Sequence, residues 1–242
     1  MKWPTLIFSL LLACSLLTSA AAAAEPEIPD LSGTWSGTTV ATMNSRIGPI
    51  GGFRTSTISR LILEIEQEGK SLEISVHTCS VEMKSTNPVV KTSLSDAFVE
   101  SLGVVVRPAM ILEEDGEFEF VVYRQYSAQG VRLRDLEHEA LPEDRSDPRI
   151  TDQDNDGNPG FTVTVSGLVS GEVYVIQRGW DYLSGPIEDE NHIEGHILWH
   201  SEQRVVAASR SLLNREPSLK RDDDPSRNYF EMTRVEEGSR CQ

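Results

Sequence analysis

Three aspartates at alternating positions give residues 152–160 the clearest chemical pattern in this chain. The segment has the sequence DQDNDGNPG. Calcium is a hard cation that takes about 6–8 oxygen ligands, so short acidic side chains must converge on one point to bind it. A tight loop turns alternate residues inward, and Gly157 allows the backbone to turn where a side chain would clash. The predicted calcium ligands are Asp152, Asp154, Asp156 and the carbonyl group of Asn158.

The same segment resembles the Asp-rich calcium loops of EF-hands, dockerins and thrombospondin type 3 repeats. The three aspartates match the first three ligand positions of such loops, and Gly157 matches the turn glycine. The resemblance ends at Val163, where an EF-hand places a glutamate. We therefore expect a calcium loop at the start of a strand, with Asp144 or Asp147 supplying further charge. The alternative is a turn without an ion, because Asp, Asn and Gly favour turns in any case.

Alternating apolar and polar residues predict that strands make up most of the chain. Leu63 and Ile65 alternate with polar neighbours in residues 58–66, and the alternation resumes in residues 71–83 after a turn at Gly69. Such alternation is typical of strands that place one face against a core. Further strands are expected over residues 117–126, 161–168, 172–178, 196–207 and 229–236. The helical pattern is weak, with one short helix expected near Asp96 and capped by Ser93, and a further helical turn in residues 209–214.

Many short strands at regular spacing favour an all-β fold, either a barrel or a β-sandwich. Gly33 and Trp35 form a Gly-x-Trp motif at the start of the first strand, and this motif resembles lipocalins and the wider calycin barrels. The resemblance implies an antiparallel up-and-down barrel in which Trp35 closes one end and Arg234 packs across it. Small barrels of about eight strands can hold one small ligand. A sandwich with Trp35 as an ordinary core aromatic is the alternative.

The first residues predict export from the cell. Lys2 precedes an apolar stretch over residues 6–17, and small residues follow up to Ala24. This pattern is typical of a secretory signal peptide, residues 1–24, followed by a single barrel-like domain over residues 25–242. The apolar stretch is short for a membrane span, so a transmembrane protein is not expected. A periplasmic or secreted protein is expected, and a lipoprotein attached through Cys14 is the alternative.

Cys79 and Cys241 remain after the predicted cleavage. An even number of cysteines in an exported protein predicts a disulfide, and two free thiols are the alternative. The bridge would join the end of the chain to its first third, as in many lipocalins. Closing so long a loop stabilises a protein by on the order of 5 kcal/mol at most.

Charge and motifs limit the classes of function. Among 242 residues, 22 are Lys or Arg and 38 are Asp or Glu, which gives a net charge of −16. Such an acidic chain would repel phosphates, so no nucleic-acid partner is expected. The sequence has no Gly-x-Ser-x-Gly elbow, no His-Glu-x-x-His motif and no Gly-rich phosphate loop, so the chain is not expected to be an enzyme.

These patterns together predict an exported, calcium-stabilised β protein. Its expected role is to bind a small apolar ligand in an interior pocket or to serve as a component of the cell envelope. Two alternatives remain open at the level of sequence. One is a surface or adhesion module with a filled core, and the other is a carboxylate-based hydrolase, because many pairs of acids are available in the chain.

Overall fold

The computed structural model describes residues 27–47, 51–167, 169–216 and 218–241. The predicted signal peptide and Cys14 lie outside this part of the chain. The elements are β1 (Gly33–Ile47), β2 (Gly51–Glu68), β3 (Ser71–Ser85), β4 (Val90–Leu94), α1 (Asp96–Ser101), β5 (Val104–Glu114), β6 (Glu117–Gln129), β7 (Phe161–Gly167), β8 (Gly171–Pro186), β9 (His192–Ala208), β10 (Ser218–Arg221), the 3₁₀ helix η2 (Pro225–Arg227) and β11 (Tyr229–Arg234).

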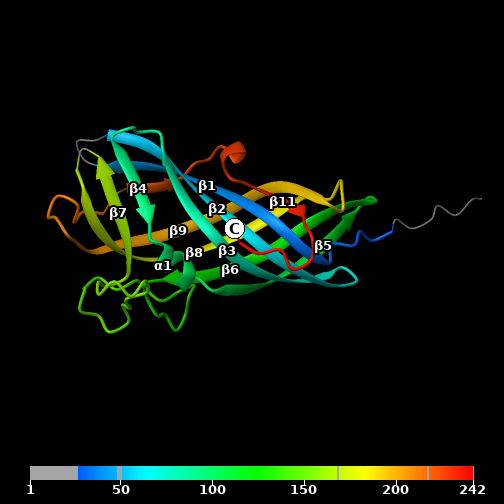
Figure 1. Ribbon diagram of the computed structural model, residues 1–242, viewed down its shortest axis with the longest axis horizontal. Helices are drawn as coiled ribbons and strands as arrows, with labels where there is room; N and C mark the ends of the chain where they lie inside the picture. Colours follow the sequence, from blue (N-terminus) through cyan, green and yellow to red (C-terminus); the bar gives the residue numbers. More distant parts are fainter. Residues whose placement is uncertain (1–26, 48–50, 168, 217, 242) are drawn as a thin grey trace, which may run out of the picture.

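The strands form one large antiparallel sheet, which confirms the prediction of an all-β antiparallel protein. Pairing runs in the order β8–β6–β5–β3–β2–β1–β11–β9, and β9 also pairs with β8. These pairings join eight strands into a closed ring, which winds along the long axis of the molecule (Figure 1). β9 pairs with β11 through residues 192–196 and with β8 through residues 196–208, so the order of pairings returns to β8.

β7 and β4 extend the wall of the ring at one end of the molecule. β8 pairs with β6 through residues 177–186 and with β7 through residues 171–175, while β9 occupies the other edge of β8. β4 pairs with β7 in turn. Helix α1 packs against β7, where the rings of Phe98 and Phe161 have centroids 4.6 Å apart.

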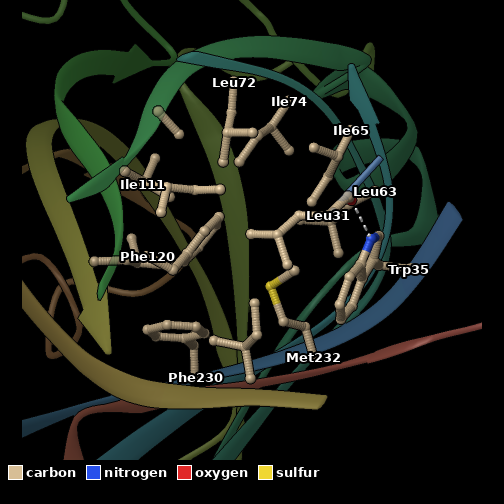
Figure 2. Close-up of a cluster of buried hydrophobic side chains, with 14 of the residues drawn as sticks. Leu31, Trp35, Leu63, Ile65, Leu72, Ile74, Ile111, Phe120, Phe230 and Met232 are labelled. Atoms are coloured by element: carbon tan, nitrogen blue, oxygen red, sulfur yellow. Dashed lines mark hydrogen bonds between the residues drawn. The ribbon is translucent and has the colours of Figure 1, made fainter. Parts of the chain in front are cut away.

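A cluster of buried apolar side chains fills the opposite end of the ring (Figure 2). Trp35 and Leu31 are fully buried there, and the Trp35 indole donates a hydrogen bond to the Leu31 carbonyl at 2.9 Å. The cluster lies where β2 and β5 end and where β3 and β6 begin, so strands from around the ring contribute to it. Its other large members include Leu63, Ile65, Leu72, Ile74, Ile111, Phe120, Phe230 and Met232. Removal of these side chains from water stabilises the closed end.

Two local expectations differ from the structure. The cap of α1 is Ser95, whose hydroxyl accepts a hydrogen bond from the Phe98 N–H at 3.1 Å. Ser93 pairs with Thr164 of β7 instead, and this pairing keeps Ser93 extended. The alternation of residues also does not predict β5, because Val104, Val105 and Val106 are consecutive apolar residues.

Candidate cation loop and interior cavity

The chain leaves the sheet after β6 and returns to it at β7 through a loop whose two ends meet. Gly130 and Gly160 stand at these ends, with φ angles of 69° and 88°. A Cβ atom on Gly130 would lie 2.7 Å from the Gly160 Cα, which is closer than side chains allow. Only glycine fits this close approach, so the ends of the loop are fixed against each other.

The first part of this loop has its own supports. The Arg149 guanidinium forms ion pairs with Asp147 at 2.8 Å and with Glu139 at 2.6 Å. The hydrogen bonds from Arg149 hold the pKa of Asp147 below its usual value. The carboxylate of Asp144 accepts hydrogen bonds from the N–H and the hydroxyl of Ser146. Asp144 and Asp147 are therefore engaged locally, and the structure does not bring them to the predicted calcium ligands.

Asp152, Asp154 and Asp156 do come together, and we refer to these three residues as the Asp cluster. One carboxylate oxygen from each lies within 4.8 Å of the others. Asn155 and Gly157, with φ angles of 55° and 86°, turn the backbone between them. The Asp152 carboxylate accepts hydrogen bonds from the N–H of Asp156 at 3.1 Å and from that of Gly157 at 2.9 Å. The loop therefore curls around the Asp152 side chain.

Asp154 is the buried member of the Asp cluster, with 5% of its surface exposed. Its Oδ2 atom accepts a hydrogen bond from the N–H of Thr162, in β7, at 3.0 Å. Its Oδ1 atom is buried and has no hydrogen-bond partner. A buried carboxylate oxygen without a partner is costly, and a bound cation would remove that cost.

Asp156 completes the cluster and also contacts β7. The Thr162 hydroxyl donates a hydrogen bond to Asp156, and the N–H of Asn158 donates another at 2.8 Å. Burial raises the pKa of Asp156, but these hydrogen bonds outweigh burial and leave the pKa below its usual value. The carboxylate is therefore ionised at neutral pH, as a metal ligand must be.

The spacing of the Asp cluster allows its three carboxylates to share one metal ion. Two oxygens that share a calcium at about 2.3–2.6 Å can lie no more than about 5 Å apart. The observed limit of 4.8 Å meets this condition. Each carboxylate oxygen has about two acceptor sites, so an oxygen that already accepts one hydrogen bond can still bind a cation. Asn158, whose carbonyl is the fourth predicted ligand, lies in the same turn.

A cavity of about 910 Å³ lies inside the ring. Its lining follows the alternation of a strand, in which every second residue points to one face. In β2 the lining residues are Phe53, Thr55, Thr57, Ser59, Leu61 and Leu63. Leu212, Arg215 and Glu216 also line the cavity and are exposed, so the cavity meets solvent at the loop before β10.

The cavity wall changes from apolar to polar along β8. From the closed end, the residues of this strand that line the cavity are Leu183, Asp181, Trp180, Gly179, Gln177, Val175 and Val173. Asp181 forms an ion pair with Arg107 of β5 at 2.6 Å. Gln177 accepts a hydrogen bond from Gln203 of β9 at 2.7 Å. Neither pair is visible in the sequence, because each joins distant residues whose register is set by the sheet.

Arg234 lies across Trp35 at the closed end. Its guanidinium carbon is 4.7 Å from the centroid of the Trp35 ring. The same guanidinium donates hydrogen bonds to the carbonyls of Asp30 at 2.6 Å and Glu190 at 2.9 Å. Gly33 has a φ angle of 118°, and a Cβ atom there would lie 3.2 Å from the Arg234 guanidinium. The Gly-x-Trp motif and Arg234 thus form one structural unit.

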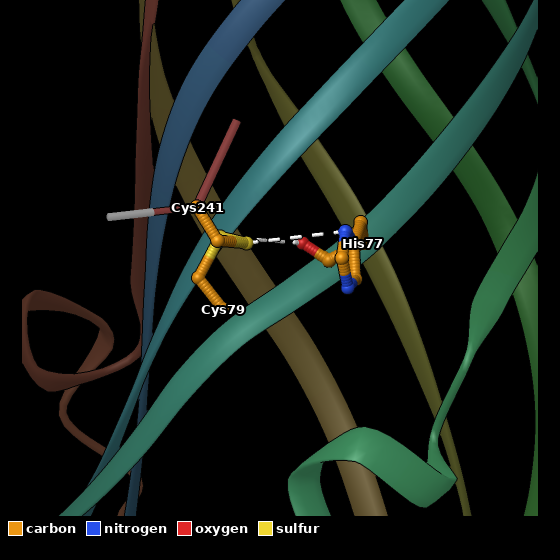
Figure 3. The surroundings of a disulfide bond; sticks show 3 residues. All are labelled: His77, Cys79 and Cys241. Atoms are coloured by element: carbon orange, nitrogen blue, oxygen red, sulfur yellow. Dashed lines mark hydrogen bonds between the residues drawn. A yellow bond between two sulfur atoms is a disulfide. The ribbon is translucent and has the colours of Figure 1, made fainter. Parts of the chain in front are cut away.

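The tail of the chain is joined to β3 by a disulfide between Cys79 and Cys241, with Cα atoms 5.2 Å apart. His77 lies beside this bridge (Figure 3). The N–H of Val235 donates a hydrogen bond to the Thr34 carbonyl at 2.9 Å, and the N–H of Gly238 donates one to the Thr34 hydroxyl at 3.3 Å, so the tail begins beside the first residues of β1.

Among the described residues, no helix has both the length and the apolar character needed to cross a bilayer. Comparison with protein-family models, curated proteins and solved structures finds no match to this chain.

Proposed function

We propose that this chain is an exported binding protein, an antiparallel β-barrel that holds a small ligand with a large apolar part. The observation that carries the proposal is the cavity of about 910 Å³ inside the ring. Ligand pockets in proteins commonly occupy about 300–1,000 Å³ and are lined mainly by apolar side chains. An adhesion module with a filled core has no use for such a space, because unfilled volume in a core lowers stability.

The barrel and its resemblance to lipocalins are part of the proposal. The closed ring of pairings favours a barrel over a sandwich, in which two separate sheets pack face to face. The burial of Trp35 beneath Arg234 agrees with the roles that the resemblance implies. The Cys79–Cys241 disulfide supports folding in an oxidising compartment such as the periplasm or the extracellular space. Attachment through a lipid on Cys14 is the alternative location.

Calcium, in this proposal, fixes the start of β7 and through it one wall of the cavity. Asp154 and Asp156 both bind Thr162. The neighbouring residue Phe161 lines the cavity and packs against Phe98 of α1. An ion that draws the three aspartates together would therefore hold Phe161 in place. The role of calcium is structural, and the ligand is held by passive burial of its apolar surface.

Titration of the purified protein with Nile red, a neutral lipophilic dye, tests the proposal. We expect saturable binding of one dye per chain, with the blue-shifted emission of an apolar site. Repetition after removal of calcium with a chelator should give weaker binding, because β7 loses its support. Dye fluorescence that rises without saturation, or no binding at all, would contradict the proposal.

A further inference from the structure

The cavity contains two opposite charges that neutralise each other. The guanidinium of Arg107 donates to the Asp181 carboxylate at 2.6 Å, and the side chains of Arg107 and Asp181 are 13% and 39% exposed. The guanidinium also donates to the main-chain carbonyls of Tyr123 and Asp181, each at 3.3 Å. The other charged or titratable residues of the lining are exposed; these are His200, Arg215, Glu216 and Glu231. The interior itself therefore has no net charge.

Uncharged polar side chains extend from this ion pair toward Val175, along β8 and its neighbours β6 and β9. They belong to Ser127, Gln129, Gln177, Ser201 and Gln203, all of which line the cavity. The cavity wall is thus polar over this band. A pure hydrocarbon ligand would displace water from this band and give no hydrogen bonds in return.

Apolar residues flank the polar band on both sides along β8. Leu183 lies on the side of the closed end, where Phe120 and Phe230 form the floor of the cavity. Val175 lies on the other side, next to Phe161 of β7. A ligand that fills the cavity must therefore be apolar over most of its length and polar at the level of Arg107 and Asp181.

We infer, on the basis of the proposed function, that the ligand is an uncharged amphipathic molecule with a hydroxyl, ester or carbonyl group beside the Arg107–Asp181 pair. An anion would meet the Asp181 carboxylate, and a cation would meet the Arg107 guanidinium. Either would lose its hydration without gaining a free partner of opposite charge. A neutral hydroxyl or carbonyl group avoids this cost and can bond to the glutamine and serine side chains of the band.

Displacement of Nile red at pH 8 by four probes with the same twelve-carbon chain tests the inference. The probes are 1-dodecanol, dodecanoate, dodecylammonium and dodecane. We expect 1-dodecanol to bind at least about tenfold more tightly than each of the others, a factor that corresponds to about 1.4 kcal/mol. Dodecanoate, dodecylammonium or dodecane binding as tightly as 1-dodecanol would overturn the inference and leave the proposed function standing. Failure of the dye and of every probe to bind would overturn the proposed function itself.

Variants of the ion pair give a second readout. Asp181→Asn leaves Arg107 without its anion and should raise the affinity for dodecanoate relative to 1-dodecanol by about tenfold. Arg107→Gln should raise the relative affinity for dodecylammonium, and the double variant should return both ratios to near the wild-type values. Glu119→Gln removes a charge from an exposed position outside the cavity and should change neither ratio. Ratios measured within one variant are insensitive to a loss of folded protein. Unchanged ratios in both single variants would overturn the inference.

Discussion

Contacts between residues close in the chain form the Asp cluster, whereas contacts between residues far apart in the chain form the cavity. The hydrogen bonds of the Asp cluster join residues no more than eight positions apart. The Arg107–Asp181 pair in the cavity spans 74 positions, and the Gln177–Gln203 pair spans 26. A site made by local contacts is visible in residue spacing, whereas a site made by distant strands becomes visible only when the register is known. The two sites should also respond differently to mutation.

Trp35→Ala should have the largest effect, because it removes the central side chain of the closed end. The free energy of unfolding should fall by about 3–5 kcal/mol, as for other buried aromatics, when measured by urea denaturation. The stabilisation gained from calcium should stay unchanged, because the hydrogen bonds that shape the Asp cluster join residues close in the chain. Leu198→Ala, at an exposed position on β9, is the control and should cost about 0.5 kcal/mol or less. If the two variants lowered the free energy of unfolding equally, the buried cluster at the closed end would not be what stabilises the ring.

Replacement of both cysteines by serine should lower the free energy of unfolding by about 2–5 kcal/mol. The bridge closes a loop with a sequence separation of 162, so its absence frees the unfolded chain. Urea denaturation of the variant, compared with the oxidised and reduced wild-type protein, measures the effect. A reduced wild-type protein as stable as the oxidised one would argue against a structural disulfide.

Calcium should add about 2.7 kcal/mol to the free energy of unfolding when its concentration is a hundred times the Kd. Asp154→Asn should abolish this gain, because the buried ligand loses its charge. Asp144→Asn, which changes a carboxylate of the same loop outside the Asp cluster, should keep it. Thermal unfolding of the three proteins with chelator and with calcium measures the difference. If Asp154→Asn kept the stabilisation by calcium, the ion would bind at a site other than the Asp cluster.

Low pH should lower the free energy of unfolding by less than any of the changes above. It should destabilise the loop between β6 and β7 more than the ring of strands. The pKa values of Asp147 and Asp156 are lowered in the folded protein, so their contribution is complete above the unfolded pKa of about 3.9. The contribution is lost as the pH falls through the folded values. In Asp147→Asn, the free energy of unfolding should fall less steeply between pH 5 and pH 3 than it does in the wild type. A variant with the wild-type slope would show that Arg149 does not stabilise the Asp147 carboxylate.

Residue patterns predict the all-β class because alternation is a local property of each strand. They also place Asp152, Asp154 and Asp156 together, since a turn of a few residues fixes their distances. They do not predict β5, whose Val104–Val106 run breaks the alternation. The cavity wall is equally hidden, because Asp181 contacts Arg107 only after β5, β6 and β8 are in register. The role of Gly130 depends on its contact with Gly160, thirty positions away in the chain.

A pair of tryptophan substitutions at neighbouring positions of β2 tests the central claim, that the ligand binds inside the ring. Ser59 lines the cavity, and Arg60 is exposed on the other face of the same strand. Nile red affinity, measured by fluorescence titration on folded protein, should fall by at least about tenfold in Ser59→Trp, because the indole occupies the ligand's space, and should stay within about twofold of wild type in Arg60→Trp. Equal affinities in the two variants, or a loss confined to Arg60→Trp, would contradict binding inside the ring.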